Sequence, residues 1–402
     1  MGLIKKESQM PINSIEISDL KTNIQEVIEP NFQDTLGNLR WPIELLAAQK
    51  GVDIQIELPS NALLRVDHLK EQILTIARQR HPKIDFTLSC QQKISSAVGN
   101  AFSEQSIPGV KNVILVASGK GGVGKSTVAS NLAVGLAQTG AQVGLLDADM
   151  YGPSMPTMFG VPADVRPSSI PGKTPERPMM VPLQRFGIKL VSMGFLVDST
   201  TPMIWRGPML ASASMQLFKE VFWEELDYLV VDLPPGTGDI QLTIAQQVAV
   251  SGAVIVSTPQ DVALADVIRA KAMFDKVKIP SLGVIENMSY FVCDNCDKRH
   301  EIFTSGGAEQ AAKKLGLPFM GAIPLESVVR AGGDIGAPVI VQSPETASAQ
   351  AMQAIVRETA TSLALRAHKL QFDSSEKGPS LKISGGINTA PKPKKTGLPI
   401  LN

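Results

Sequence analysis

Apolar residues gather in short uninterrupted runs over much of this chain, and the runs alternate with longer segments of helical spacing. The runs between residues 113 and 324 are bounded by Gly, Pro or Asp: VILVAS, VGLLDAD, KLVSMGF, YLVVDLP, GAVIVST, SLGVIEN and PFMGAIP. A strand that is apolar throughout is buried on both faces, which is typical of a parallel sheet covered by helices. The pattern therefore predicts an α/β fold with a doubly wound, mostly parallel sheet, and its ligands would bind where the strands end.

The first hundred residues follow a different pattern, which predicts a small α+β domain at residues 1–100. The expected helices and strands lie at residues 18–29, 43–48, 52–58, 66–80 and 83–89, the first and fourth being helices. The second helix has one apolar face, formed by Leu69, Ile73, Ile76 and Ala77. The step Gln49-Lys50-Gly51 is expected to be a hairpin turn.

The α/β pattern assigns residues 101–370 to the second domain, after a linker around residues 91–109. Within it, the Pro-rich residues 164–185 are expected to form an irregular surface loop. A last helix would span residues 346–370. The remaining residues, 371–402, are rich in Ser, Gly, Pro and Lys, which predicts a disordered tail.

The composition narrows the classes of partner and compartment. Among 402 residues, 38 are basic and 38 acidic, and this balance argues against nucleic-acid binding as the main activity. No stretch approaches the roughly 20 apolar residues that span a bilayer, and the opening MGLIKKESQM lacks the apolar core of a secretory signal. Three cysteines cannot form a disulfide framework, so we expect a protein of the reducing cytoplasm without a membrane partner.

A phosphate-binding loop is the strongest chemical signal. Residues 119–126, GKGGVGKS, fit the pattern G-x-x-x-x-G-K-S directly after the run VILVAS and before a helix that begins near Ser126. Glycines let the backbone N–H groups turn toward phosphate, and the helix N-terminus adds a partial positive charge. Lys125 would pair with phosphate oxygens and Ser126 would bind Mg²⁺. The predicted fold is therefore of the P-loop NTPase type, with ATP as substrate.

Two acidic groups and one lysine could complete this site. Asp232 follows the run YLVV, where it could approach Mg²⁺ through water. The pair Asp147 and Asp149 ends the run VGLL, where a carboxylate could orient the attacking water. Each acid alone could instead be a helix cap or a solvated turn residue. Lys120, a second lysine inside the loop, is either a solvent-facing side chain or a charge-neutralising contact in the transition state.

Cys293 and Cys296 form a C-x-x-C pair that follows the run SLGVIEN. Zinc and iron–sulfur centres generally take four ligands, and this chain has no second such pair. His300 with another ligand could close a zinc site within one chain, or a two-fold dimer could bring two pairs together. A redox-active dithiol and a reduced pair without function are the remaining readings. Cys90 is expected to be a buried structural thiol.

At this point the sequence resembles a known family. KGGVGKST is similar to the deviant Walker A motif of the MinD, ParA and nitrogenase iron-protein class. The segments DADMYGPSMP, DLPPGTGD, ENMSYFVCDNC and SGGAEQAAKKLGLPFMGAIPL resemble, within that class, the Mrp/ApbC iron–sulfur cluster carriers. The resemblance covers roughly residues 100–370. It implies an ATPase that carries a cluster and passes it to apoproteins in concert with assembly factors.

The resemblance also implies roles for individual residues. Lys120 would reach the nucleotide of the partner subunit in a homodimer, Asp149 would position water, and Asp232 would lie in the second switch segment. Asn287 would read the adenine base, and Cys293 and Cys296 would hold a [4Fe–4S] cluster that bridges two subunits. The nucleotide-binding set would be Gly119, Lys120, Gly121, Gly122, Val123, Gly124, Lys125, Ser126, Thr127 and Asn287.

Two further expectations follow. The first domain is similar to the small domain that these carriers often bear, but a cysteine often found in that domain is absent here, since Cys90 lies in its last expected strand. The alternative function is a regulatory or partitioning ATPase of the MinD or ParA type. MinD-like proteins end in an amphipathic helix that binds the membrane. Such a helix is not expected here, because the tail is interrupted by Gly385, Gly386, Pro391, Pro393 and Pro399.

Overall fold

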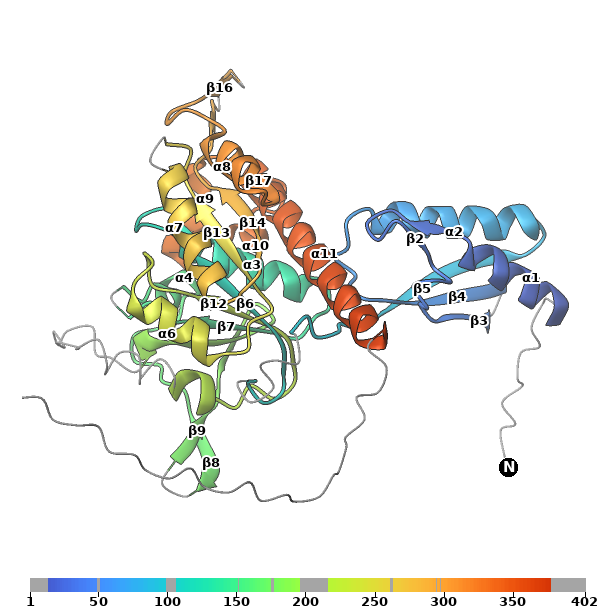
Figure 1. Cartoon of the computed structure of the whole chain (residues 1–402), viewed down its shortest axis with the longest axis horizontal. Helices are drawn as coiled ribbons and strands as arrows, with labels where there is room; N and C mark the ends of the chain where they lie inside the picture. The colour runs from blue at the N-terminus through green and yellow to red at the C-terminus, as the bar shows by residue number, and fades with distance from the viewer. Residues whose placement is uncertain are drawn as a thin grey trace, which may run out of the picture.

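The larger part of the chain is built around one eight-stranded sheet (Figure 1). The computed structural model describes residues 14–48, 51–98, 106–150, 152–174, 177–195, 216–260, 263–293, 295–296 and 298–376. All strand pairs of this sheet are parallel except β10 with β11. In spatial order the strands are β10 (Leu183–Arg185), β11 (Ile188–Ser192), β7 (Val143–Asp147), β12 (Leu226–Asp232), β6 (Val110–Ala117), β13 (Gly252–Ser257), β14 (Ser281–Glu286) and β17 (Phe319–Ala322).

Both faces of this sheet are buried, which confirms the predicted doubly wound fold. In β6, Ile114 and Val116 face one core, and Val113 and Leu115 face the other. Successive strand residues point to opposite faces, so an uninterrupted apolar run fills both cores. The first core packs against α3 (Lys125–Gln138), α4 (Met155–Met158), α10 (Val339–Gln342) and α11 (Ala347–Glu376). The second packs against α6 (Asp239–Gln247), α7 (Ala263–Lys276) and α8 (Gly307–Leu315).

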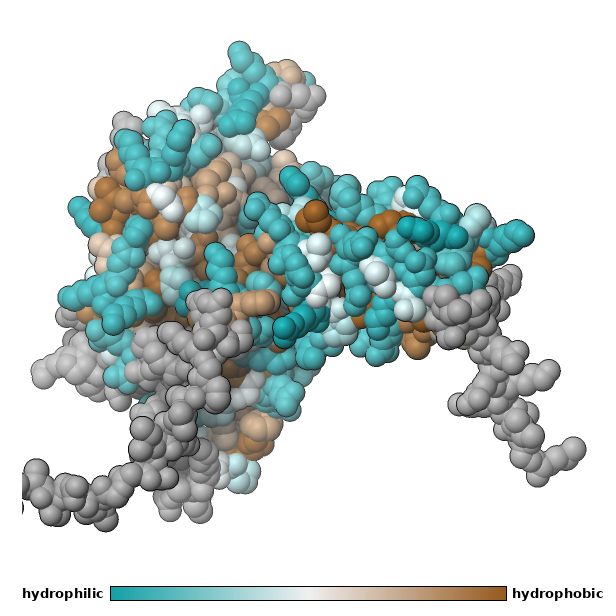
Figure 2. All heavy atoms as spheres, turned by 45° about the vertical axis from the view of Figure 1, so that its right-hand side comes forward, coloured by the Kyte–Doolittle hydropathy of each residue, from teal (hydrophilic) through white to brown (hydrophobic). Residues whose placement is uncertain are grey.

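The front domain is a small sheet with two helices on one face. Its strands β3 (Ile43–Ala48), β4 (Gly51–Leu58) and β5 (Asp85–Gln92) pair in that order, and α1 (Ser14–Gln25) and α2 (Val66–Arg80) cover them. Burial alternates along β4, and the residues that point inward contact the apolar face of α2. The surface that this domain turns outward in Figure 2 is mainly hydrophilic. Ala48 pairs with Gly51, which confirms the hairpin, and residues 49–50 lie outside the described residues.

The first helix was predicted too far along the chain. It ends at Gln25, and residues 28–29 form the short strand β1 (Ile28–Glu29), which pairs with β2 (Asp34–Thr35). Pro30 disfavours helical geometry at the residue before it, so the helix cannot continue through Glu29. The buried Glu29 carboxylate instead accepts hydrogen bonds from the backbone N–H groups of Asn31 and Phe32.

The last helix, α11, joins the two parts of the chain (Figure 1). Thr361 Oγ1 accepts a hydrogen bond from the backbone N–H of Leu64 at 3.0 Å, and the Arg366 side chain donates to the Ala97 carbonyl at 3.0 Å. This helix continues to Glu376, beyond its expected end at residue 370. Residues 377–402 lie outside the described residues, so the disordered tail stays a prediction. No helix in the described part of the chain is both long and apolar enough to cross a bilayer.

Residues 164–185 were wrongly predicted to be irregular. They contain the antiparallel pair β8 (Ser169–Thr174) and β9 (Arg177–Met180), followed by the edge strand β10. Pro171 and Pro178 interrupt the alternation by which strands are recognised in a sequence. A proline is nevertheless tolerated in a strand that needs no hydrogen bond from it, as at an edge or in a two-stranded hairpin.

Candidate active site and cysteine hairpin

The predicted phosphate loop lies between β6 and the N-terminus of α3. Gly124 immediately precedes the helix with φ of 78°, a left-handed conformation that favours glycine. A Cβ atom at this position would lie 2.2 Å from Nδ2 of Asn287, so the residue must also be small. Gly119 is restricted by packing instead, because a Cβ there would lie 2.5 Å from the Cβ of Asp266. The backbone N–H groups at the start of α3 can therefore bind an anion without an intervening side chain.

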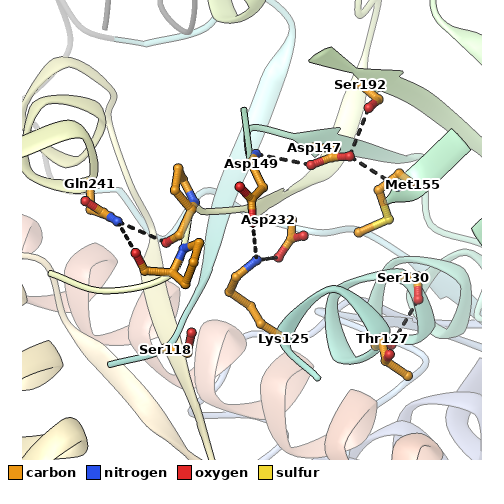
Figure 3. Close-up of polar contacts among 12 residues, drawn as sticks. Ser118, Lys125, Thr127, Ser130, Asp147, Asp149, Met155, Ser192, Asp232 and Gln241 are labelled. Carbon is orange, nitrogen blue, oxygen red and sulfur yellow. Dashed lines mark hydrogen bonds and ion pairs between the residues drawn. The ribbon is translucent and has the colours of Figure 1, made fainter. Parts of the chain in front are cut away.

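Lys125 is buried among acidic side chains, as Figure 3 shows. Its Nζ lies 2.5 Å from Oδ1 of Asp232 and 4.0 Å from Oδ2 of Asp149. The three residues come from α3, from the end of β12 and from the segment after β7. The structure thus brings together Lys125, Asp149 and Asp232, three of the residues that the sequence assigned to catalysis.

Asp232 is fully buried, and burial raises the pKa of its carboxyl above the usual range. The neighbouring Lys125 ammonium and a hydrogen bond from Ser126 act in the opposite direction. Within the described residues, Oδ2 of Asp232 has no hydrogen-bond partner. A buried oxygen in that state has an open acceptor position, and water bound to Mg²⁺ could fill it.

Asp147 holds the segment that follows β7. Its carboxylate accepts hydrogen bonds from the backbone N–H of Asp149 at 3.1 Å, from that of Met155 at 3.2 Å and from the Ser192 hydroxyl at 2.9 Å. Burial, with the nearby Asp232 carboxylate as a second cause, raises the pKa of Asp147 to about 7. The side chain therefore positions Asp149 through the backbone.

Ser192 is a residue that sequence reasoning missed. Parallel pairing places it beside Asp147, which in turn pairs with Asp232, so three neighbouring strands end in three polar residues at the same level. Its hydroxyl oxygen also accepts a hydrogen bond from the Gly194 N–H at 3.0 Å. The polar end of the run KLVS was the available signal, but only the strand order shows that it adjoins the acids.

Lys120 points toward residues of its own chain. Its Nζ donates to Oε1 of Gln260 at 3.2 Å and lies 3.7 Å from Oδ2 of the buried Asp266 on α7. The Ser118 hydroxyl donates to the Lys120 carbonyl at 2.8 Å, which fixes the backbone at this point of the loop. The contact with a partner's nucleotide stays a prediction.

The segment that follows β12, residues 233–241, also contacts the loop. The backbone N–H of Gly236 donates to the Ser118 carbonyl at 2.9 Å, and Gly236 has a φ of 96°. The Gln241 side chain donates to the carbonyls of Pro234 and Pro235, at 3.1 and 2.8 Å (Figure 3). These are the bonds that a moving switch segment would have to exchange.

Asn287 lies directly behind the loop. Its Nδ2 donates to the Val123 carbonyl at 2.8 Å, and its backbone N–H donates to the Ser257 carbonyl at 2.8 Å. A cavity of about 590 Å³ opens beside it, large enough for a nucleoside. Its lining includes Gly124, Thr127, Asn287, Met288, Pro324 and Leu325.

The cysteine pair lies on a short hairpin, formed by β15 (Phe291–Val292) and β16 (Arg299–His300), that projects from the body of the protein (Figure 1). Cys293 is half-buried, Cys296 is exposed, and the Cys293 N–H donates to the Lys298 carbonyl at 3.0 Å. The Arg299 guanidinium stacks over the Tyr290 ring at 3.8 Å, which ties the two strands together. The pair is thus held at the tip of an ordered hairpin.

No group of three or more His, Cys, Asp or Glu side chains in the described part of the chain is placed to hold a metal ion. A zinc site closed by His300 within one chain therefore finds no support among the described residues. The motif also lies between two strands rather than at the start of a helix, unlike a thioredoxin-type dithiol.

Cys90 lies away from this hairpin, on β5 of the front domain. It pairs with Ile56 of β4 and packs, half-buried, against the front-domain core. Burial raises the pKa of its thiol, which keeps the thiol protonated and unreactive. These properties agree with a structural cysteine that is less fully buried than expected.

Comparison with known proteins now identifies the family. Residues 109–360 match the family described as ParA, NUBPL iron-transfer P-loop NTPase. The chain belongs to this family. The match spans the parallel sheet and most of its helices, and it includes the phosphate loop, Asp149, Asp232 and the cysteine hairpin.

Individual proteins are also similar to this chain. A protein of Synechocystis named iron–sulfur cluster carrier protein is 44% identical over 352 residues, which cover 86% of this chain and 97% of that one. The iron–sulfur cluster transfer protein NUBPL of Dictyostelium discoideum is 50% identical over 252 residues, or 63% of this chain and 76% of that one. A nucleotide-binding protein from Archaeoglobus fulgidus, solved in complex with ADP, is 40% identical with a TM-score of 0.52 and covers 60% of this chain and 92% of that one.

Proposed function

We propose that this protein binds and hydrolyses ATP and carries a [4Fe–4S] cluster, which it passes to iron–sulfur apoproteins. The coarser statement, a nucleotide-binding P-loop NTPase of an iron-transfer family, follows from the family itself. The finer statement rests on the geometry of two sites. Relatives named for iron–sulfur clusters favour it over a MinD- or ParA-type regulatory ATPase.

The nucleotide site supports the hydrolysis proposal through its charges. The loop N–H groups and Lys125 would bind the phosphates, while Ser126 and a water held by Asp232 would bind Mg²⁺. The open Oδ2 of Asp232 fits that assignment. Bound Mg²⁺ would neutralise charge on the phosphates as it develops. Asp149, positioned by Asp147, would orient the attacking water, and Asn287 would face the base.

The observation that carries the cluster proposal is the position of the thiol pair. Cys293 and Cys296 are presented on a projecting hairpin, and the described residues around them offer no third metal ligand. A four-iron cluster takes four thiolates, so one chain supplies half of the set. Two-fold symmetry places the same residues opposite each other and would complete it, which makes the carrier a homodimer bridged by its cargo.

Nucleotide and cluster would then be linked through the dimer. Lys120 contacts Gln260 and Asp266 of its own chain, and in the dimer it would exchange them for the partner's phosphates. Assembly factors would load the cluster, and recipient apoproteins would remove it from the exposed hairpin. The balanced charge of the chain supports protein partners rather than nucleic acid.

Anaerobic reconstitution with iron and sulfide tests the proposal. We expect visible absorption and about two irons per chain, which corresponds to one four-iron cluster shared by two chains. The Cys293→Ala/Cys296→Ala double variant should bind no iron, while a Cys90→Ser variant, which alters the remaining cysteine, should bind as much as the wild type. Iron uptake that survives the double substitution, or stoichiometric zinc in its place, would refute the cluster proposal.

A further inference from the structure

Glu286 holds both ends of the segment that carries the cysteines. It is the last residue of β14, and only 1% of its surface is exposed. Its Oε1 accepts hydrogen bonds from the Ser289 hydroxyl at 2.5 Å and from the Gly306 N–H at 3.1 Å, and its Oε2 accepts one from the Ala308 N–H at 2.8 Å. Ser289 opens this segment, residues 289–306, and Gly306 closes it. One buried carboxylate therefore fixes the base of the cysteine hairpin.

The next residue, Asn287, holds the phosphate loop. Its amide donates to the Val123 carbonyl, and its Nδ2 packs so closely on Gly124 that no side chain could be inserted there. Two adjacent residues at the end of strand β14 thus contact the nucleotide loop and the cysteine segment. Val123 and Gly124 thus both lie against the Asn287 side chain, so a shift of this part of the loop toward Asn287 would press on it.

Further hydrogen bonds hold the described residues at each end of the cysteine segment. The Tyr290 carbonyl accepts a hydrogen bond from the Leu325 N–H at 2.7 Å, and Arg299 stacks on the ring of Tyr290. At the other end, the Thr304 hydroxyl donates to the Pro259 carbonyl at 3.0 Å. Pro259 adjoins Gln260, the partner of Lys120, so the hairpin base is linked to the other end of the phosphate loop through residues 259–260.

We propose that Glu286 is a positioning residue that transmits occupancy of the nucleotide cavity to Cys293 and Cys296. The inference rests on the proposed function, which assigns that cavity to a nucleotide. Phosphate bound by the loop N–H groups displaces Val123 and Gly124, Asn287 follows, and the Glu286 carboxylate moves Ser289 and Gly306 with it. The two thiols then differ in exposure between the empty and the nucleotide-bound chain.

A purely structural role would have another consequence. As a cap on the N-terminus of α8, the Glu286 carboxylate would stabilise the fold equally with and without nucleotide. Its replacement would then lower stability and leave the response of the cysteines to nucleotide unchanged. The response to nucleotide, rather than stability, separates the two roles.

The test measures the alkylation rates of Cys293 and Cys296 by iodoacetamide in the iron-free full chain, resolved by peptide mass spectrometry. In the wild type, we expect saturating Mg-ADP to change the rates by about fivefold or more, the usual lower end of coupling between sites. Glu286→Gln preserves size, but its amide nitrogen is a donor that replaces one carboxylate oxygen, so the side chain can no longer accept the bonds from both Gly306 and Ala308. In this variant we expect the ratio of the alkylation rates with and without Mg-ADP to fall to near one, while ADP binds as tightly as before.

Glu29→Gln is a matched control. Glu29 is likewise buried and likewise accepts hydrogen bonds from two backbone N–H groups, but it lies in the front domain. This variant should keep the wild-type ratio. If Glu286→Gln fails to fold, Ser289→Ala removes one bond of the same carboxylate, and a reduced ratio in that variant supports the proposal.

Three results would overturn the inference. In the first, Mg-ADP leaves the alkylation rates of the wild type unchanged. In the second, Glu286→Gln responds to Mg-ADP as strongly as the wild type does. In the third, Glu286→Gln does not fold and Ser289→Ala responds as strongly as the wild type does. The proposed function fails in a different way. A wild-type chain that takes up no cysteine-dependent iron contradicts the cluster proposal whatever the ratio, and one that does not bind ADP contradicts both.

Discussion

Lys125 Nζ lies 2.5 Å from Oδ1 of Asp232, and both side chains are buried where β12 ends beside the phosphate loop. This buried pair leaves the lysine close to where phosphate would bind. Bound phosphate oxygens would compete with Asp232 for the same ammonium group.

Lys125→Ala should reduce ATP hydrolysis by about 100-fold or more, the usual loss when a group that stabilises transition-state charge is removed. The fold should survive, because Asp232 has a raised pKa and can take up a proton once its partner is gone. Steady-state hydrolysis and circular dichroism check both statements. Lys93→Ala, which breaks a surface pair with Glu57, is the control. A wild-type rate of ATP hydrolysis in Lys125→Ala would contradict the phosphate-site assignment.

Asp149→Asn should lower kcat by about 100-fold, the typical contribution of a positioned acid or base. Nucleotide affinity should change little, because the acid would orient water rather than bind phosphate. Hydrolysis at saturating ATP, combined with equilibrium dialysis of nucleotide, separates the two effects. Asp275→Asn, on the exposed surface of α7, should behave like the wild type. A loss that appears only in affinity would contradict the assigned role.

Asp147→Asn should change how stability depends on pH. The pKa of Asp147 rises from 3.8 in the unfolded chain to about 7 in the folded one, so the folded chain keeps its proton longer as pH rises. The stability that this carboxyl contributes is complete below pH 3.8 and is lost as pH rises through 7. Across this window, the wild type should lose on the order of 4 kcal/mol relative to Asp147→Asn. Urea unfolding of both proteins at a series of pH values measures the difference, and a difference independent of pH would contradict the prediction.

Cys293→Ala and Cys296→Ala should each abolish the cluster, because two thiolates from each chain are needed to complete four ligands. Nucleotide binding should persist, since neither cysteine lines the nucleotide cavity. Iron per chain and visible absorption after reconstitution measure the first effect, and dialysis of nucleotide measures the second. A single variant that still carries a normal cluster would show that the ligands lie elsewhere.

Local signals in the sequence were sufficient for the phosphate loop and for most strands. The loop is recognisable because glycine spacing, the lysine and the flanking elements are all contiguous in the chain. The uninterrupted apolar runs likewise predicted the parallel sheet, because a strand that is buried on both faces has apolar residues at successive positions. The errors arose near prolines. Pro30 prevents the first helix from continuing through Glu29, where the prediction had extended it, and Pro171 and Pro178 occur in a hairpin that the sequence did not reveal.

The contacts between distant segments depend on strand order, which a single sequence does not state. Ser192, Asp147 and Asp232 meet only because β11, β7 and β12 are neighbours in register. The double contact of Glu286 and Asn287 is similar, since it requires the phosphate loop and both ends of the cysteine segment to meet at the end of β14.

The sequence by itself determined that this protein has a phosphate-binding loop, a parallel sheet and a thiol pair, because each of these depends on residues close together in the chain. The tertiary structure decided which side chains face one another: Lys120 with Gln260, Lys125 with Asp232, and Asp147 with Ser192. The physical reason is that hydrogen bonds and burial act over a few ångströms in space. Only the folding of the sheet brings residues so far apart in sequence within that range.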